Sequence, residues 1–440
     1  MSRALATDLY ELNMVASYLR RGMTAPATFS LFTRDLPPRR GFLVAAGLAD
    51  CLDYLESFAF AGEDLDWLRG AGFGEDTVRQ LASLRFTGDV HAVPEGRVVL
   101  PGEPLLEVTA PVAEAQLAET ILLNQVTFQT VIATKATRCR LAAPGIELVD
   151  FALRRTHGLD AGLAVARVSA IAGFTATSNV AAARRYGLPA AGTMAHSYIE
   201  AFRDEAAAFR AFAQDLPGRA TFLVDTYDTL AGVRTAARVI RELGLTCGLG
   251  VRLDSGDLAG LAREARQLLD EAGLPQVRIF VSGGLDEYGL ARLRAAGAPV
   301  DAAGIGTRMG VSADAPSLDS AYKLVAYDGR PVLKLSAGKA TLPGRKQVWR
   351  RPPIAEDLLA ARDEAGPDGW EPLLVPVMRG GVRVAEPDTV PAARERLDRD
   401  LAALPPAALD LHEPVPPRVR VSDALQDLAG VLAREHLAVP

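Results

Sequence analysis

Short apolar segments recur through the middle of this chain, and each ends in a polar or glycine-bearing loop that leads into a helical pattern. Five segments share this arrangement: residues 147–151, 188–191, 221–224, 249–253 and 277–281. Repeated strand–loop–helix units are typical of an α/β barrel, in which functional residues follow the C-terminal ends of the strands. The pattern therefore predicts an α/β fold, an irregular α/β barrel, and an enzyme whose active site lies at one rim.

The segments on either side of this barrel carry a different pattern, which mixes helices with turn-bounded strands. Apolar spacing predicts helices over 8–21 and 114–141 and strands over 27–32, 90–108, 323–327 and 331–335. These elements indicate an α+β domain built from the N-terminal segment and the strands after the barrel.

The domain boundaries follow from these two patterns. We expect the α+β domain over residues 1–120, joined by about 320–350, and the barrel over 121–320. The remaining segment, 351–440, holds 13 of the 28 prolines and is interpreted as a loosely structured, Pro-rich C-terminal appendage.

Composition narrows the class of protein. A net charge of −6 over 440 residues argues against nucleic acid as the main partner. No apolar run approaches the roughly 20 residues that span a bilayer, and the N-terminus lacks the pattern of a signal peptide. Three widely separated cysteines, Cys51, Cys139 and Cys247, suit a reducing compartment, so we expect a cytoplasmic enzyme.

Lysine is unevenly distributed along the chain. The sequence contains five lysines, and four of them lie between Lys323 and Lys346. Two interpretations remain open for this cluster: a solvated strand face, or a basic rim beside a phosphate.

Glycine-rich loops follow two neighbouring apolar segments late in the predicted barrel. The first contains Gly283 and Gly284, and the second contains Gly306, Thr307 and Arg308. The first loop precedes a predicted helix that begins near residue 286. Backbone N–H groups in such a loop, next to a helix N-terminus, can hold a phosphate, and in barrels the phosphate site is commonly built after the last two strands. The alternative is that these glycines only permit tight turns.

Carboxylates gather at the ends of two other predicted strands. Arg252 and Asp254 share one side of a strand because side chains alternate along it, and Asp225 follows the preceding strand. Carboxylates at one rim suit Mg²⁺, which binds through one or two of them together with water and substrate phosphates. Asp228 and Asp257 stand at helix starts, where an N-cap is an equally good interpretation.

His196 follows the apolar segment 188–191 and admits three interpretations. It can be a hydrogen-bonded structural residue, a metal ligand, or a nucleophile that accepts a phosphoryl group on a ring nitrogen. A metal site would need partners, and the chain has only five scattered histidines. The structural and the nucleophilic interpretations stay open on the sequence alone.

Taken together, the motifs resemble those of nicotinate phosphoribosyltransferases, a family of type II phosphoribosyltransferases of NAD salvage. The matching stretches occur in the family's order at residues 7–12, 151–155, 177–179, 192–197, 225–228, 252–258, 281–285, 304–309 and 334–339. The resemblance implies that nicotinate and 5-phosphoribosyl-1-pyrophosphate give nicotinate mononucleotide and pyrophosphate. It also implies coupling to ATP hydrolysis through phosphorylation of His196, with Mg²⁺ as the cofactor, in a homodimer with shared active sites.

The resemblance assigns roles to further residues. Tyr10, from the other subunit of the homodimer, and Phe151 would enclose the pyridine ring. The groups around the nicotinate or the ribose would be Arg154, Thr193 and Arg252. The 5′-phosphate would be held by Gly283, Gly284, Gly306 and Thr307. Asp254 and Asp225 would bind Mg²⁺ or the ribose hydroxyls, and Asp254 would also stabilise the positive charge that develops at the anomeric carbon.

Substrate choice depends on one position. Related nicotinamide phosphoribosyltransferases carry an Asp where this chain has Ser178. Ser178 can donate to a carboxylate that an Asp would repel, so the acid is the expected substrate. The chain departs from the family at Ala152, where Gly is usual, and we expect the added methyl to crowd the backbone beside the base. Nicotinamide or quinolinate transfer on the same fold, and a non-catalytic nucleotide-binding homologue, are the alternatives.

Overall fold

The computed structural model describes residues 3–336 and 340–437. The chain divides into two compact units, one made of Met1–Val131 and Ser317–Pro440 and the other of Ile132–Pro316. Helix α6 (Glu119–Ala142) runs without a break from the first unit into the second.

The first unit is built around a seven-stranded sheet in the order β13-β12-β1-β5-β3-β17-β18. The strands are β1 (Pro26–Thr33), β3 (Asp89–Ala92), β5 (Pro104–Pro111), β12 (Ser320–Tyr327), β13 (Arg330–Pro331), β17 (Val375–Arg379) and β18 (Val382–Arg383). The inner strand β1 pairs antiparallel with β5 and with β12, so residues about 300 positions apart meet in one sheet. The sheet expected from the N-terminal segment and the strands after the barrel is therefore present.

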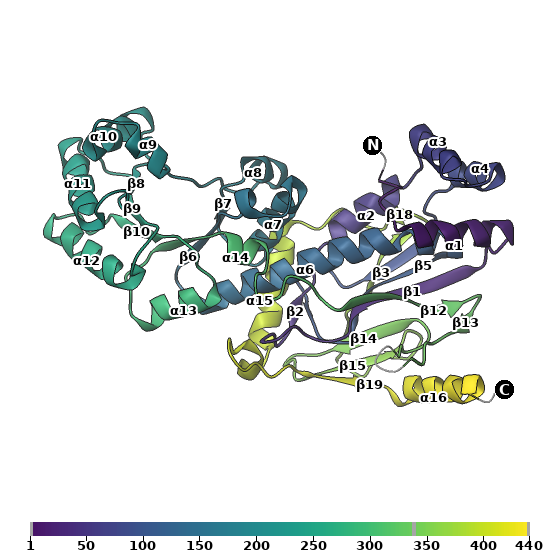
Figure 1. Ribbon diagram of the computed structural model, residues 1–440. Coiled ribbons are helices and arrows are strands. Elements are labelled where there is room, and N and C mark those ends of the chain that lie inside the picture. Colours follow the sequence, from purple (N-terminus) through teal and green to yellow (C-terminus); the bar gives the residue numbers. More distant parts are fainter. Residues whose placement is uncertain (1–2, 337–339, 438–440) are drawn as a thin grey trace. The chain divides into compact units, whose positions relative to one another are not determined.

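Two smaller sheets and a set of helices complete the first unit (Figure 1). One sheet joins β16 (Glu371–Pro372), β14 (Lys346–Arg350), β15 (Glu356–Ala361) and β19 (Arg418–Val421), and a short pair joins β2 (Leu43–Val44) and β4 (Val98–Val99). The helices are α1 (Leu9–Arg20), α2 (Leu48–Ser57), α3 (Gly62–Gly70), α4 (Glu75–Ser83), α5 (Val112–Leu117), α15 (Val390–Ala403), the 3-10 turn η2 (Pro406–Leu409) and α16 (Asp423–Leu437).

The C-terminal segment is more regular than its proline content suggested. Leu359, Leu373 and Leu425 belong to the same apolar core as residues of β1 and α1, and Asp400 pairs with the buried Arg97. Two of the prolines fall where they cost little: Pro391 in the first turn of α15 and Pro376 beside an irregularity in β17. Residues 351–437 are thus an integral part of the first unit rather than a loose appendage.

The second unit contains a six-stranded parallel sheet in the order β7-β6-β11-β10-β9-β8. Its strands are β6 (Glu147–Asp150), β7 (Ala176–Thr177), β8 (Thr221–Leu223), β9 (Gly250–Leu253), β10 (Arg278–Val281) and β11 (Ala302–Ile305). The expected α/β class is confirmed. Within the described residues, β7 and β8 are edges that do not pair with each other, so the barrel is open between them. The predicted strand at 188–191 is reduced to a single parallel bridge between Ala190 and Thr177.

Helices flank this sheet, with α10 to α13 along the outer side of β8, β9 and β10 (Figure 1). The helices of this unit are η1 (Leu153–Arg155), α7 (Leu159–Ile171), α8 (Val180–Tyr186), α9 (His196–Glu200), α10 (Glu205–Asp215), α11 (Thr229–Glu242), α12 (Leu258–Glu271), α13 (Glu287–Ala295) and α14 (Thr307–Gly310). In α11 the stripe that contains Val233, Ala237 and Ile240 is buried, as its helical spacing predicts. Strands covered on both faces are nearly continuous apolar runs, which is why the sequence located β6, β8, β9 and β10.

Candidate active site

Arg252, on β9, is the centre of a contact network at the C-terminal edge of the parallel sheet. Its Nε donates to Ser282 Oγ (2.8 Å) and its Nη2 to Asp254 Oδ1 (2.8 Å). Its Nη1 donates to Thr193 Oγ1 (3.1 Å), and the guanidinium carbon lies 5.3 Å from the centre of the Phe151 ring. The side chain is only 12% exposed. One arginine therefore joins the ends of β6, β9 and β10 to the segment that precedes His196.

Asp254 is held as a carboxylate by its surroundings. Burial on its own would raise its pKa, but hydrogen bonds from Ser282 and Arg252 and the electrostatic influence of Arg252 and His196 outweigh burial and lower the pKa below the usual range for aspartate. Asp254 is consequently ionised at neutral pH, with the negative charge directed to the edge of the sheet where Arg252 lies.

Asp225, at the end of β8, is tied to Asp254 through the backbone. Its Oδ2 accepts from the Asp254 N–H (3.0 Å) and from Ser255 Oγ (2.6 Å). Its Oδ1 is buried and has no hydrogen-bond partner among the described residues. Asp228 is accounted for as the N-cap of α11, since it accepts from the Ala231 N–H (2.8 Å). Asp257 occupies the N-cap position of α12 without a capping hydrogen bond.

The pair formed by Asp225 and Asp254 fits the requirements of Mg²⁺. In the part of the chain that the structure describes, no group of three or more His, Cys, Asp or Glu side chains could hold a metal ion by itself. Mg²⁺ needs only one or two carboxylates when a substrate supplies phosphate oxygens. The unpartnered Oδ1 of Asp225 supplies a free ligand atom of the kind that magnesium prefers.

His196 begins the short helix α9 and is half-buried. Its Nδ1 lies 3.2 Å from the hydroxyl oxygen of Thr226, the residue that follows Asp225. His196 also contributes to the low pKa of Asp254, so the two side chains act on each other electrostatically. The contact with Thr226 fixes the orientation of the imidazole ring.

Phe151 provides a flat apolar surface at the end of β6. Its ring lies beside Phe280, with the ring centres 5.6 Å apart. A Cβ on Gly304 would lie 2.5 Å from a carbon of the Phe151 ring, so this position has to be glycine for the ring to occupy its place.

The methyl of Ala152 does not crowd the ring face of Phe151. Ala152 is fully buried and has ordinary right-handed helical dihedral angles. A Cβ on Gly310 would lie 2.4 Å from the Ala152 Cβ, which places the methyl against the backbone of α14. Because Gly310 has no side chain, there is room for the Ala152 methyl at a position where the family usually has glycine.

The two glycine loops lie beside these groups. Gly283 has a φ of +98°, and a Cβ there would lie 2.0 Å from the backbone oxygen of Asp254, so both conformation and space require glycine. Gly284, with a φ of +64°, also adopts the left-handed region. Gly306 precedes α14, and a Cβ there would lie 3.3 Å from the Phe151 oxygen. Gly283, Gly284 and Thr307 are exposed.

The start of α13 differs from the sequence expectation. Asp286 caps this helix by accepting from the Gly289 N–H (2.9 Å), and its other oxygen accepts from Arg308 (2.9 Å). The helix terminus is thus occupied by a carboxylate of the chain itself. The groups left for a phosphate are the loop N–H groups at residues 283–284 and 306–308.

The other residues that the sequence analysis assigned to the site, Arg154, Ser178 and Tyr10, each lie on a different element. Arg154 is exposed on η1, and Ser178 is half-buried after β7, where its backbone N–H donates to the Asp150 oxygen (2.8 Å). Tyr10 belongs to the first unit and is 47% exposed on α1. Its pKa is raised by burial of its hydroxyl and by the nearby Glu119.

The predicted lysine cluster does not form one face. Lys346 is buried, donates to the Gly344 oxygen (2.7 Å) and pairs with Glu107 (3.1 Å). Lys334 is exposed, and residues 337–339 of the motif at 334–339 lie outside the described residues.

The roles of several residues that contact the candidate site or the start of α13 were not predicted from the sequence. Ser282 and Thr226 position Arg252 and His196, respectively. The fully buried Lys135 of α6 pairs with Glu287 at the start of α13 (2.6 Å). A charged residue within a largely apolar helix was the one available signal for Lys135.

A buried arginine, two linked aspartates and glycine loops at one edge of a parallel sheet are typical of α/β enzymes that bind phosphorylated substrates. Residues 5–127 match the family described as nicotinate phosphoribosyltransferase (NAPRTase) N-terminal domain, and residues 146–336 match the nicotinate phosphoribosyltransferase (NAPRTase) family. The chain belongs to the nicotinate phosphoribosyltransferase family of enzymes.

Individual relatives agree with this assignment. The chain is 49% identical to nicotinate phosphoribosyltransferase pncB2 of Mycobacterium tuberculosis over 93% of this chain and 89% of the relative. It is 45% identical to nicotinate phosphoribosyltransferase of Bacillus subtilis over 79% of this chain and 73% of the relative. The crystal structure of human nicotinic acid phosphoribosyltransferase is similar, with a TM-score of 0.86, 31% identity and coverage of 97% of this chain and 99% of that chain. Among the described residues, we find no helix with the length and apolarity needed to cross a membrane.

Proposed function

We propose that this enzyme transfers the phosphoribosyl group of phosphoribosyl pyrophosphate to the ring nitrogen of nicotinate, giving nicotinate mononucleotide and pyrophosphate. Membership of the family supports the reaction. The observation that carries the proposal for this chain is the position of Arg252, which contacts Phe151, Asp254, Ser282 and Thr193 at the edge of the parallel sheet.

Phe151 and Arg252 are suited to orient the base. Phe151 offers a ring face on which a pyridine can stack, and the guanidinium 5.3 Å from that ring offers a positive charge for the carboxylate of nicotinate or for ribose oxygens. The ring nitrogen of nicotinate carries a free lone pair at neutral pH, so the chain needs no general base. We assign Arg154 and Thr193 to the same group of substrate contacts.

Asp254 is suited to stabilise the transition state. The bond between the anomeric carbon and pyrophosphate breaks as the bond to the pyridine nitrogen forms, and the sugar acquires positive charge. The low pKa of Asp254 keeps its carboxylate ionised at neutral pH. A fixed negative charge beside the sugar stabilises this transition state without reorganisation.

The loops and carboxylates at the strand ends are suited to hold the phosphates. We assign the 5′-phosphate to the backbone N–H groups around Gly283, Gly284, Gly306 and Thr307, because successive N–H groups in such loops bind anions. Asp225 and Asp254 would hold Mg²⁺, which would neutralise charge on the departing pyrophosphate. The unpartnered Oδ1 of Asp225 supports this assignment.

We also propose that His196 couples the reaction to ATP. If Nδ1–H donates to the Thr226 hydroxyl, Nε2 keeps its lone pair and can attack the γ-phosphorus of ATP. The bond from that phosphorus to ADP then breaks, and hydrolysis of the N–P bond returns the free imidazole and phosphate.

The remaining proposals concern assembly, substrate choice and compartment. An exposed Tyr10 beside an exposed Leu9 on α1 suits a subunit contact, so we assign Tyr10 to the partner's base site in a homodimer. Ser178, unlike an aspartate, does not repel the carboxylate of nicotinate. All three cysteines are free thiols, in keeping with a reducing, cytoplasmic compartment.

The decisive experiment measures mononucleotide formation from nicotinate, nicotinamide and quinolinate, with and without ATP and Mg²⁺. We expect product from nicotinate only, increased by ATP, with the increase lost in His196→Ala and retained in the exposed control His436→Ala. Product from nicotinamide would refute the role given to Ser178, and ATP stimulation that survives in His196→Ala would refute the phosphohistidine.

A further inference from the structure

An ion pair joins the two glycine loops to which we assign the 5′-phosphate. β10 and β11 are neighbouring parallel strands, so the loops that follow them begin side by side at the C-terminal edge of the sheet. Arg308 comes two positions after Gly306, and its Nη1 donates to Oδ2 of Asp286 (2.9 Å). Asp286 in turn comes two positions after Gly284. The pair therefore links the end of one loop to the end of the other.

Asp286 brings a negative charge close to the proposed phosphate. Its side chain is 11% exposed, and its Oδ1 accepts from the Gly289 N–H (2.9 Å) as the N-cap of α13. Neighbouring Cα atoms are about 3.8 Å apart, so the carboxylate lies within about 10 Å of the Gly284 N–H. A phosphate bound at that loop carries nearly two negative charges. An uncompensated carboxylate at this distance, with little water around it, would repel the phosphate.

The next carboxylate along the chain, Glu287, is compensated separately. Glu287 is fully buried and pairs with Lys135 (2.6 Å) and with Arg138 (3.0 Å). Asp286 pairs with Arg308, whose side chain is 52% exposed. Replacement of Arg308 thus leaves the two cations of Glu287 in place, and the charge that loses its partner is that of Asp286.

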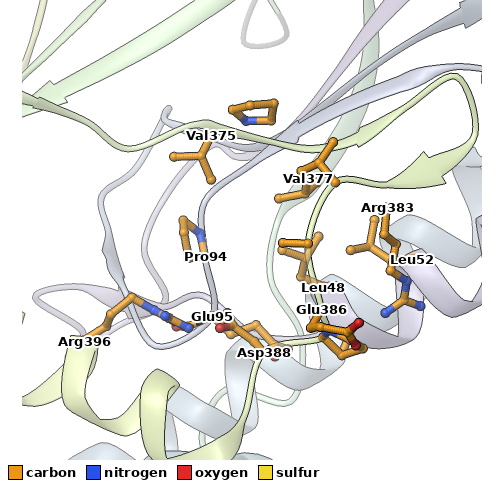
Figure 2. Close-up of a pocket in the computed structure, with 15 residues that line it drawn as sticks. Leu48, Leu52, Pro94, Glu95, Val375, Val377, Arg383, Glu386, Asp388 and Arg396 are labelled. Carbon is orange, nitrogen blue, oxygen red and sulfur yellow. Dashed lines mark hydrogen bonds and ion pairs between the residues drawn. The ribbon is translucent and has the colours of Figure 1, made fainter.

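The cavity of the first unit does not offer the phosphate an alternative site. α2, the hairpin of β17 and β18, the segment 384–388 and α15 contribute to its wall. Figure 2 shows two arginines there, Arg383 and Arg396, together with the carboxylates of Glu95, Glu386 and Asp388. Arg396 already pairs with Asp388. Three carboxylates against two guanidiniums leave no surplus of positive charge for an anion.

On the basis of the proposed phosphate site, we propose that Arg308 is an electrostatic positioning residue for phosphoribosyl pyrophosphate. Its guanidinium cancels the charge of Asp286, so the 5′-phosphate meets the N–H groups of the two loops without a repelling carboxylate beside them. Arg308 acts through Asp286 and does not need to touch the substrate. Because a single nitrogen of Arg308 makes the contact, a lysine ammonium at this position serves the same purpose.

Steady-state kinetics of the full-length enzyme, with phosphoribosyl pyrophosphate and nicotinate varied in turn, tests the proposal. Arg308→Gln should raise the KM for phosphoribosyl pyrophosphate about ten-fold, as expected for a like charge left close to the phosphate. The KM for nicotinate should change little. Isothermal titration with ribose 5-phosphate should show a similar loss of affinity. Arg308→Lys should behave like the parent enzyme in both assays.

Arg210→Gln is the matched control for the loss of one positive charge. Arg210 pairs with Glu242 (2.8 Å) between α10 and α11, and both side chains are partly exposed. This variant also removes one arginine from an ion pair of the second unit. It should leave the KM for phosphoribosyl pyrophosphate unchanged, because neither residue belongs to a glycine loop.

A variant of the carboxylate separates the effect of charge from that of structure. Asp286→Asn keeps the cap of α13, since asparagine caps a helix as well as aspartate does. Combined with Arg308→Gln, it should bring the KM for phosphoribosyl pyrophosphate back to near the parent value, because no charge is left to compensate. The ratio of the KM of Arg308→Gln to that of the parent should also fall as KCl is raised, because salt screens exposed charges. A purely structural defect would show neither effect.

Three results would each overturn the proposal: a parent-like KM for phosphoribosyl pyrophosphate in Arg308→Gln, an equal defect in Arg308→Lys, or a defect that persists in the double variant. A parent enzyme that formed no mononucleotide would instead refute the proposed function itself. The two failures are therefore distinguishable in the same assay.

Discussion

Replacing Gly304 by alanine adds one methyl group behind the ring of Phe151. The new Cβ would lie 2.5 and 2.6 Å from two carbons of that ring and 3.1 Å from Phe280. Carbon atoms at rest are about 3.5–4.0 Å apart, so the Phe151 ring must move by about 1 Å. Gly304 does not have a positive φ, so the perturbation is steric and not a matter of backbone strain.

The displaced ring is the surface on which we place the pyridine. A misplacement of about 1 Å can reduce a rate about 100-fold, and overpacking of a core costs about 1–3 kcal/mol of stability. We therefore expect Gly304→Ala to lower kcat/KM for nicotinate by between about 10-fold and 100-fold and to lower the Tm by several degrees. The KM for phosphoribosyl pyrophosphate should stay near that of the unmodified enzyme.

Steady-state kinetics with each substrate varied in turn is the assay, and differential scanning calorimetry gives the stability. Gly62→Ala is the control, because a Cβ there has no neighbour within 4 Å. An unchanged kcat/KM for nicotinate at a clearly lowered Tm would show that the Phe151 ring does not position the base, and the stacking argument would then fail.

The same structure predicts the effects of three other substitutions. Asp254→Asn should lower kcat about 100-fold with little effect on the KM for nicotinate, and a kcat near that of the parent enzyme would contradict its electrostatic role. His91 on β3 has its pKa lowered to about 4, first by burial and then by the charges of Arg362 and Arg379. Because the folded-state pKa lies below the unfolded value of 6.5, the stabilising contribution is present above pH 6.5 and is lost as the pH falls toward 4. His91→Gln should flatten this part of the dependence of the unfolding free energy on pH, as urea titrations at several pH values would show. Lys135→Met removes one of the two cations paired with the buried Glu287 and should cost about 3–5 kcal/mol in urea unfolding, whereas a cost under about 1 kcal/mol would mean that the remaining cation, Arg138, compensates Glu287 by itself.

The elements that were predictable are those whose burial is uniform along the strand. β9 is buried at three of its four residues, and β10 is buried or half-buried at all but its first residue, so their apolar runs identified them directly. β7 is only two residues long, and 188–191 contributes a single bridge, because pairing there depends on neighbouring strands rather than on local composition. The C-terminal segment was misjudged because proline counts ignore where each proline falls within an element.

The residues of the candidate site also divide into those that a local sequence pattern predicts and those that it does not. Asp254 and Arg252 were expected on one side of β9 because alternation along a strand is a local rule, and their hydrogen bond agrees with it. The capping of α13 by Asp286 is also local, yet the glycines before it suggested an open helix terminus. The pairing of Lys135 with Glu287 joins positions about 150 residues apart, and no periodicity in one sequence encodes such a contact.

The pairing of β1 with β12 has a consequence for the order of assembly during synthesis. Ala27 meets Tyr327 in that pair, while the second unit is one uninterrupted stretch from Ile132 to Pro316. The second unit has all its strands once residue 316 has left the ribosome. Strand β1 of the first unit must wait longer with one edge unpaired, although its residues are made earlier. The part of the enzyme that begins later in the chain can thus finish folding earlier, and the N-terminal strands are the region most in need of protection from aggregation in the interval.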